Sequence, residues 1–118
     1  MSKNIVGYQI VSDSNKMKFD DRITYLLKQG YSLYKNVSVL DNEDTFLYTH
    51  ELVKYENNDQ YIKMTNYYLV VLSSESSFNE KTESLINNGW TLYGKLIIFK
   101  DGSDFWYIHA FVKCEDTN

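Results

Sequence analysis

The two histidines of the chain, His50 and His109, are the side chains best suited to chemistry, because imidazole binds metals and transfers protons near neutral pH. Together with Glu51 or another carboxylate they could hold a metal ion. A zinc site uses three or four ligands, however, and the chain contains neither a His-x-x-x-His nor a Cys-x-x-Cys motif. We therefore expect each histidine to form hydrogen bonds within a sheet, and we expect no metal and no cofactor.

Carboxylates are plentiful, but their positions do not suggest catalysis. Asp20 and Asp21 fall near a predicted helix start, and residues 41–44 form a polar turn, where carboxylates favour the helix dipole or solvent. The sequence has no glycine-rich phosphate loop and no Gly-x-Ser-x-Gly motif. We therefore expect no enzymatic activity.

Aromatic residues make binding the more promising activity, since they account for 16% of the chain and include eleven tyrosines. Several of them follow two glycine turns or lie near the histidines. The candidate ligand-binding residues are Tyr34, Tyr48, His50, Trp90, Tyr93, Tyr107 and His109. Their rings could stack a base while the imidazoles bind its edge, and nearby lysines could neutralise phosphates. These lysines are Lys35, Lys54, Lys95 and Lys113. The alternative is that the rings form the core.

These candidates recur because the chain is an internal duplication with an offset of 59 residues and no gap. Gly30 aligns with Gly89, and His50 aligns with His109. Further aligned pairs are Tyr8 and Tyr67, Leu26 and Leu85, Tyr34 and Tyr93, and Tyr48 and Tyr107. Two copies are too few for a solenoid, so we expect a closed pseudo-twofold pair.

Each copy shows the same order of periodicities, which predicts a β-α-β-β unit. A short aromatic and β-branched run is followed by apolar residues at helical spacing, which begin near Phe19 and Phe78 and stop at the glycine. Ser77 and Glu80 are spaced as a capping box for the second helix. An alternating run, a polar turn and another strand complete each unit, and Asp101-Gly102 favours a hairpin.

The expected fold is α+β: a duplicated β-α-β-β unit with about six mainly antiparallel strands and two helices packed on one face. The repeats span about 7–56 and 66–115, and a polar connection, 57–65, joins them within a single domain, 1–118. We do not expect two domains, because half of this chain would bury little surface alone.

The last predicted strand, residues 105–112, is apolar on both of its alternating faces. Its counterpart in the first copy carries Thr49 and Glu51 on one face. Such a strand lies either in the middle of the domain or against another molecule. We therefore expect a homodimer or higher homo-oligomer, with Trp106, Ile108 and Phe111 at the interface.

The composition limits the classes of molecule that this protein is expected to bind. The 118-residue chain has a net charge of −4 and a single arginine, Arg22, which argues against general binding to duplex nucleic acid. It has no long apolar run and one cysteine, Cys114, so we expect no signal peptide, no membrane span and no disulfide. The expected location is the cytoplasm, or the host cytoplasm for a viral protein.

The second copy also resembles a known family. Phe78, Leu85 and Ile86 precede the run Gly89-Trp90-Thr91-Leu92-Tyr93-Gly94, which is similar to the Gly-Trp-x-x-Tyr-Gly turn of the small bacterial and phage family called domain of unknown function 1737. The first copy has Tyr31 in place of the tryptophan and Lys35 in place of the second glycine. The resemblance implies fold and a bacterial or phage origin, but no catalytic residues.

These observations favour a non-enzymatic binding protein, expected to be a phage-type protein that sequesters a small nucleotide-like signalling molecule and so blunts host defence. The first alternative is a protein-protein interaction module that inhibits or scaffolds a cellular enzyme. A further alternative is binding of single-stranded RNA by exposed aromatic rings.

Overall fold

The computed structural model describes residues 4–56 and 62–116, which form eight elements. In chain order these are β1 (Ile5–Asp13), α1 (Lys16–Lys28), β2 (Ser32–Asn42), β3 (Thr45–Tyr55), β4 (Ile62–Leu72), α2 (Glu75–Asn87), β5 (Thr91–Asp101) and β6 (Asp104–Asp116). The order confirms the predicted α+β class with two similar β-α-β-β halves.

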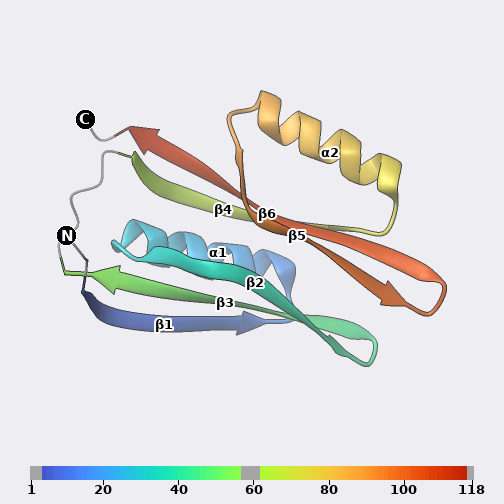
Figure 1. Ribbon diagram of the computed structural model, residues 1–118, viewed down its shortest axis with the longest axis horizontal. Coiled ribbons are helices and arrows are strands. Elements are labelled where there is room, and N and C mark those ends of the chain that lie inside the picture. Colours follow the sequence, from blue (N-terminus) through green and yellow to red (C-terminus); the bar gives the residue numbers. More distant parts are fainter. Residues whose placement is uncertain (1–3, 57–61, 117–118) are drawn as a thin grey trace.

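The six strands divide equally between two antiparallel sheets. The first sheet has the order β1-β3-β2, and the second has the order β4-β6-β5. Figure 1 shows the two units side by side, with β1 and β4 running in the same direction. The last strand of each unit is therefore central in its sheet, which explains why residues 105–112 are apolar on both faces.

Both helices end where the glycines predict. Gly30 has a φ of 98° and Gly89 a φ of 90°, a backbone conformation that glycine adopts without strain. The next residue closes the helix in each unit: the Tyr31 N–H donates to the Leu26 carbonyl at 3.1 Å, and the Trp90 N–H donates to the Leu85 carbonyl at 2.9 Å. These bonds form a Schellman motif, which places Tyr31 and Trp90 at equivalent sites.

The predicted helix starts were wrong by about one turn. The N-caps are Asn15 and Ser74 rather than the predicted Ser77. The Asn15 Oδ1 accepts from the Lys18 N–H at 2.9 Å, and the Ser74 Oγ accepts from the Ser77 N–H at 3.2 Å. Apolar periodicity misses this first turn because its side chains are mostly polar.

The predicted connection between the units is also too long at its C-terminal end. β4 begins at Ile62, so residues 62–65 belong to a strand, and a register shift between Met64 and Asn66 absorbs one residue. Residues 57–61 of the predicted connection lie outside the described residues. The run Ile62-Lys63-Met64-Thr65 alternates apolar and polar side chains, so a strand signal is present there next to the polar residues that precede it.

The second strand of each unit, β2 or β5, has a shift in its pairing register at the equivalent place. Register shifts lie between Tyr34 and Ser38 in β2 and between Tyr93 and Ile97 in β5. Lys35 has a φ of 59° in the first unit, where Gly94 has 74° in the second. A bulge of this kind bends the strand and turns its side chains, so both sheets curve at equivalent positions.

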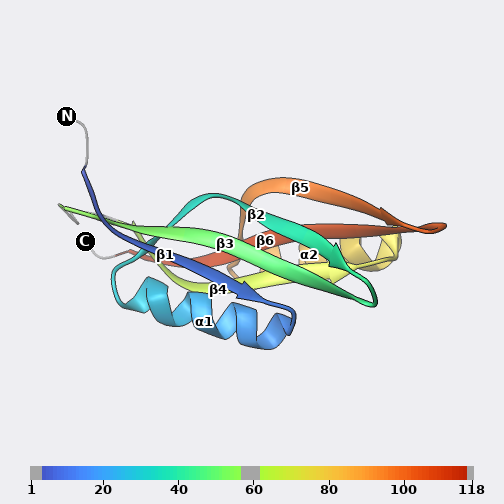
Figure 2. The ribbon, with the colours of Figure 1, turned by 90° about the horizontal axis from the view of Figure 1, so that it is seen from below.

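One hydrophobic core joins the two units. Figure 2 shows α1 alongside β1 and β4, and the helix contacts not only its own sheet but also β4 of the second unit. The buried residues of this shared core are Val11, Phe19, Ile23, Leu27, Leu33, Val37, Tyr48, Leu52, Tyr67, Leu69, Ile108, Ala110 and Val112.

A smaller core lies under α2, on the other face of the second sheet. Val70, Leu85 and Phe111 are buried there, with Phe78 and Trp90 packed against them. Within the described residues, no helix is long and apolar enough to span a membrane.

Candidate ligand-binding site

His50 is buried in the shared core with both ring nitrogens bonded. The Lys35 carbonyl can only accept, so the His50 Nε2–H donates to it at 3.2 Å. The Nδ1 atom then accepts from the Tyr67 hydroxyl at 3.0 Å, and burial raises the pKa of Tyr67 so that this hydroxyl keeps its proton. Burial lowers the pKa of His50 to about 4. The imidazole is a neutral structural group with no nitrogen left for a ligand.

His109 has a different environment despite its equivalent place in the repeat. Its Nδ1–H donates to the Ala110 carbonyl at 2.9 Å, which leaves Nε2 as the acceptor. Its ring lies 5.6 Å from that of Phe111, in the face of the second sheet that α2 covers, whereas His50 lies in the shared core. Within residues 4–56 and 62–116, no three His, Cys, Asp or Glu side chains converge on a metal position.

The predicted tyrosines are spread over the molecule rather than gathered into one site. Tyr93 lies beside His50 with ring centroids 5.8 Å apart, while Tyr48 packs on Phe19 at 5.7 Å. Burial raises the pKa of Tyr48 and of Tyr93.

Tyr107 and Tyr34 lie elsewhere. Tyr107 packs on Phe78 under α2, with ring centroids 5.9 Å apart. The Tyr34 ring has the Lys35 ammonium 5.2 Å from its centroid. Of the seven predicted ligand residues, only His50 and Tyr93 contact each other through their rings, and a single site containing all seven is not formed.

Trp90 belongs to a separate group, which we call the basic aromatic cluster: Lys16, Tyr68, Lys81, Trp90 and Lys113. The two rings lie 5.9 Å apart at 52°. The Lys16 and Lys81 ammonium groups lie 3.9 Å and 5.2 Å from the Tyr68 centroid, and that of Lys113 lies 5.5 Å from the Trp90 centroid. Three positive charges therefore surround two adjacent, partly buried rings.

Four elements and one turn build this cluster. Trp90 is held by the Schellman turn after α2, and Tyr68 comes from β4. Lys113 comes from β6, Lys81 from α2 and Lys16 from the first residue of α1, so the first unit contributes one charge. Tyr68 is not among the predicted site residues, because its counterpart in the first copy is Gln9 and no repeated aromatic pair marks the position.

The lysines differ in how far they are neutralised. Lys16 forms an ion pair with Asp20, in addition to its contact with Tyr68. Across the described ranges 4–56 and 62–116, neither Lys81 nor Lys113 forms an ion pair. These two ammonium groups are therefore available to an anion, and each is close to a ring face.

A cavity of about 340 Å³ lies at the hairpin ends of the two sheets, shares Lys16 with the cluster and has the opposite charge. Its walls include Phe46 and Trp106, whose rings meet edge to face at 5.4 Å. The acidic residues that line it are Asp41, Glu43, Asp44 and Asp101, and Lys16 is the only basic one among the lining residues described. Carboxylates in this number repel phosphate groups, so the cavity does not suit a nucleotide.

The predicted interface residues need correction. Ile108 and Phe111 are fully buried within the chain itself, on the two opposite faces of β6, and Trp106 packs against Phe46. Their apolar character arises because β6 is the central strand of a sheet that is covered on both faces. Ile108 and Phe111 therefore do not form a free surface for a partner, whereas Trp106 is partly buried and lines the acidic cavity.

No family model, no curated protein and no solved structure matches this chain. The resemblance of Gly89-Trp90 and its neighbours to domain of unknown function 1737 stays a prediction from those residues.

Proposed function

We propose that this protein is a non-catalytic binding protein that sequesters a small anionic ligand with an aromatic ring, such as a nucleotide-type signal, at the basic aromatic cluster. The observation that carries the proposal is the contact of Tyr68 and Trp90 with three lysines, two of which form no ion pair within the described residues. In a phage protein, such sequestration would lower the free concentration of a signal on which host defence depends.

The chemistry of the cluster matches the two parts of a nucleotide. A planar base can stack on an indole or phenol face, which contributes about 1–3 kcal/mol for each stacked base. The ammonium groups of Lys81 and Lys113 can bind phosphate oxygens as point charges. Because the chain as a whole carries a net charge of −4, this local positive group favours anions at one place on the surface.

Calorimetric titration with ADP-ribose, cyclic dinucleotides and nucleoside monophosphates tests the proposal. Substitution Trp90→Ala removes a stacking face and should weaken binding by about 10-fold or more. Lys113→Gln should weaken binding several-fold and reduce its salt dependence. Lys95→Gln is the matched control, since Lys95 lies on β5 outside the cluster. Absence of binding by every ligand, or binding that survives Trp90→Ala unchanged, contradicts the proposal.

The acidic cavity favours a second candidate function, a protein-protein interaction module. Its carboxylates surround the Phe46 and Trp106 rings, and a lysine or arginine side chain of a partner protein could enter this cavity and contact both charge and ring. The double substitution Asp44→Asn with Asp101→Asn would weaken such a partner while leaving the nucleotide contacts of Trp90, Lys81 and Lys113 in place, since none of these three lines the cavity. The two functions are therefore separable by one pair of variants.

A further inference from the structure

The contact between the two units within one chain provides a template for contacts between chains. In the second unit, the face of the sheet that carries Tyr67, Leu69 and Val112 is buried against the first unit. We call this the receiving face. The first unit covers it with α1 and with the face of its own sheet that carries Val37 and Tyr48, which we call the covering face.

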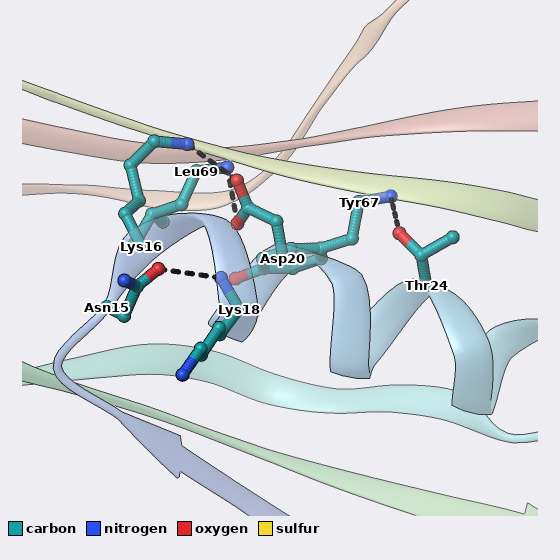
Figure 3. A network of polar contacts seen from close by, with 7 residues as sticks. All are labelled: Asn15, Lys16, Lys18, Asp20, Thr24, Tyr67 and Leu69. Atoms are coloured by element: carbon teal, nitrogen blue, oxygen red, sulfur yellow. Dashed lines mark hydrogen bonds and ion pairs between the residues drawn. The ribbon is translucent and has the colours of Figure 1, made fainter.

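Polar contacts position α1 along the edge of the receiving face. Asp20 Oδ1 accepts from the Leu69 backbone N–H at 3.1 Å, and Thr24 Oγ1 accepts from the Tyr67 backbone N–H at 3.0 Å (Figure 3). These backbone groups belong to β4, an edge strand of the second sheet. The helix therefore protects a strand edge that would otherwise be open to pairing.

The receiving face of the first unit is exposed. Ile10, the counterpart of the fully buried Leu69, is 53% exposed. Tyr8 and Leu40, the counterparts of Tyr67 and Phe99, are exposed as well. At the same edge a cavity of about 340 Å³ opens between β1 and α1, with Ile10, Tyr25 and Arg22 among its lining residues. The exposed apolar face of the first sheet, the open edge of β1 and this cavity therefore lie next to one another.

The covering face of the second unit is exposed too. The counterparts of Leu33, Val37, Val39 and Phe46, which are buried or partly buried in the shared core, are all apolar and exposed. They are Leu92, Leu96, Ile98 and Phe105. Ile98 is 58% exposed. Both halves of the internal contact are thus present a second time without being used within the chain, and Figure 1 shows α2 and β1 on opposite sides of the molecule.

The polar contacts can recur as well. In α2, Asn79 and Glu83 occupy the positions of Asp20 and Thr24, and each carries a side-chain oxygen that can accept from a backbone N–H. Their partners by equivalence are the N–H groups of Ile10 and Tyr8 in β1.

The histidine contact has only a partial counterpart. His50 accepts from the Tyr67 hydroxyl through Nδ1, whereas His109 has Nε2 as its acceptor, and Tyr8 could donate to it only by giving up its bond to Glu51. Glu51 replaces Ala110 beside this position and already accepts from Tyr8 at 2.8 Å. The Glu51 carboxylate, which stands in place of the Ala110 methyl group, makes the uncovered face more polar. It could also form a hydrogen bond with His109.

We propose that the chain binds a second copy of itself head to tail, with the covering face and α2 of one copy against the receiving face and β1 of the next. The contact is heterologous, since two different surfaces meet. Each added copy therefore presents the same free surfaces again, and the assembly either closes as a ring or grows as a filament. Such an assembly differs from a twofold homodimer, in which one surface meets itself.

Complementary variants test this arrangement. Ile10→Asp disables only the receiving face, and Ile98→Asp disables only the covering face. Each variant alone should sediment as a monomer in analytical ultracentrifugation, with self-association weakened by at least about 30-fold relative to wild type. An equimolar mixture should form a discrete dimer that does not grow, because each copy retains the surface that the other has lost.

Met17→Asp is the matched control. Met17 is exposed, and its counterpart Ser76 stays exposed in the internal contact, so this change should leave assembly intact. Unchanged circular dichroism and thermal melting of all three variants would show that the fold is kept. A wild-type protein that stays monomeric at near-millimolar concentration, a single variant that still assembles, or a mixture that stays monomeric would overturn the proposal.

Discussion

The two units of this chain share their elements, their turns and their apolar pattern, yet each buries a different face of its sheet against the other unit. Leu69 in β4 is fully buried, whereas Ile10, at the same place in β1, is 53% exposed. On the other face the difference in burial is reversed: Val37 of the first unit is buried, and Leu96 of the second is exposed. The pattern within a unit thus marks both faces as able to pack, and the neighbouring unit decides which one does.

The largest expected effect comes from shortening the two equivalent side chains. Leu69→Ala removes a fully buried side chain and should lower the free energy of unfolding by about 3–4 kcal/mol. Ile10→Ala should cost less than about 1 kcal/mol in the monomer, because the side chain is already half in solvent. Urea denaturation at low protein concentration measures both. Equal losses would mean that the two faces are packed alike.

His50 should make the stability of the protein depend on pH in acid. The pKa of His50 is depressed to about 4 by burial, so the folded state binds a proton less readily than the unfolded state. Its contribution to stability is therefore complete above the unfolded value of about 6.5 and is lost as pH falls through about 4, a change of the order of 3 kcal/mol.

Subtracting the pH profile of the His50→Gln variant from that of wild type isolates this contribution from other groups. The difference in unfolding free energy should slope between pH 4 and pH 6.5. A flat difference would show that His50 is not desolvated in the folded protein.

Alanine substitutions at Gly94 and Gly102, which both have positive φ, distinguish the cost of backbone strain from the cost of steric crowding. Gly102 has a φ of 65° and open space where a Cβ would lie, whereas a Cβ on Gly94 would approach Asn36 Oδ1 to 2.5 Å. Both alanine substitutions should cost about 1 kcal/mol for the backbone, and Gly94→Ala should cost about 1 kcal/mol more. Lys35 tolerates a similar φ in the first unit, so the extra cost is local to the contact between units.

Restoring space should recover that extra cost. In the double variant Asn36→Ala with Gly94→Ala, thermal unfolding should return toward the Gly102→Ala value. If the double variant is no better than Gly94→Ala alone, the approach of β2 to β5 is not the cause.

The smallest expected effect is that of replacing Asp20 in α1 with asparagine, the residue at the equivalent position of α2. Burial raises the pKa of Asp20 to about 6, despite its bond to Lys16, so the stability it contributes is complete below the unfolded value of 3.8 and is lost as pH rises through about 6. Asp20→Asn, which copies Asn79 of α2, keeps an oxygen for the Leu69 N–H. It should raise stability by roughly 1 kcal/mol at pH 7 and leave it unchanged below pH 4. A pH-independent effect would contradict this interpretation.

Part of the fold follows directly from local sequence. Gly30 and Gly89 end the two helices because a residue with positive φ is required after the last turn, and Asp101-Gly102 forms the predicted hairpin for the same reason. The helix starts were misjudged because the side chains of each first turn are mostly polar, whereas the first residues of β4, Ile62-Lys63-Met64-Thr65, do alternate apolar and polar side chains.

The candidate site was less predictable. Trp90 was identified from its turn, but its partner Tyr68 has no aromatic counterpart in the first copy, and Lys16 joins the cluster only because α1 lies against β4. Contacts of this kind join residues far apart in the chain, and neither spacing nor periodicity reports them.

The sequence by itself determined two copies of a β-α-β-β unit, because periodicity and glycine conformations act over a few residues and are the same in both copies. Only the tertiary structure decided that His50 is enclosed beside Tyr67 while His109 lies under α2, and that Leu69 is buried while Ile10 is not. The physical reason is that burial and hydrogen bonding depend on the neighbouring unit. Two equivalent positions therefore take different roles when only one of them has a neighbour.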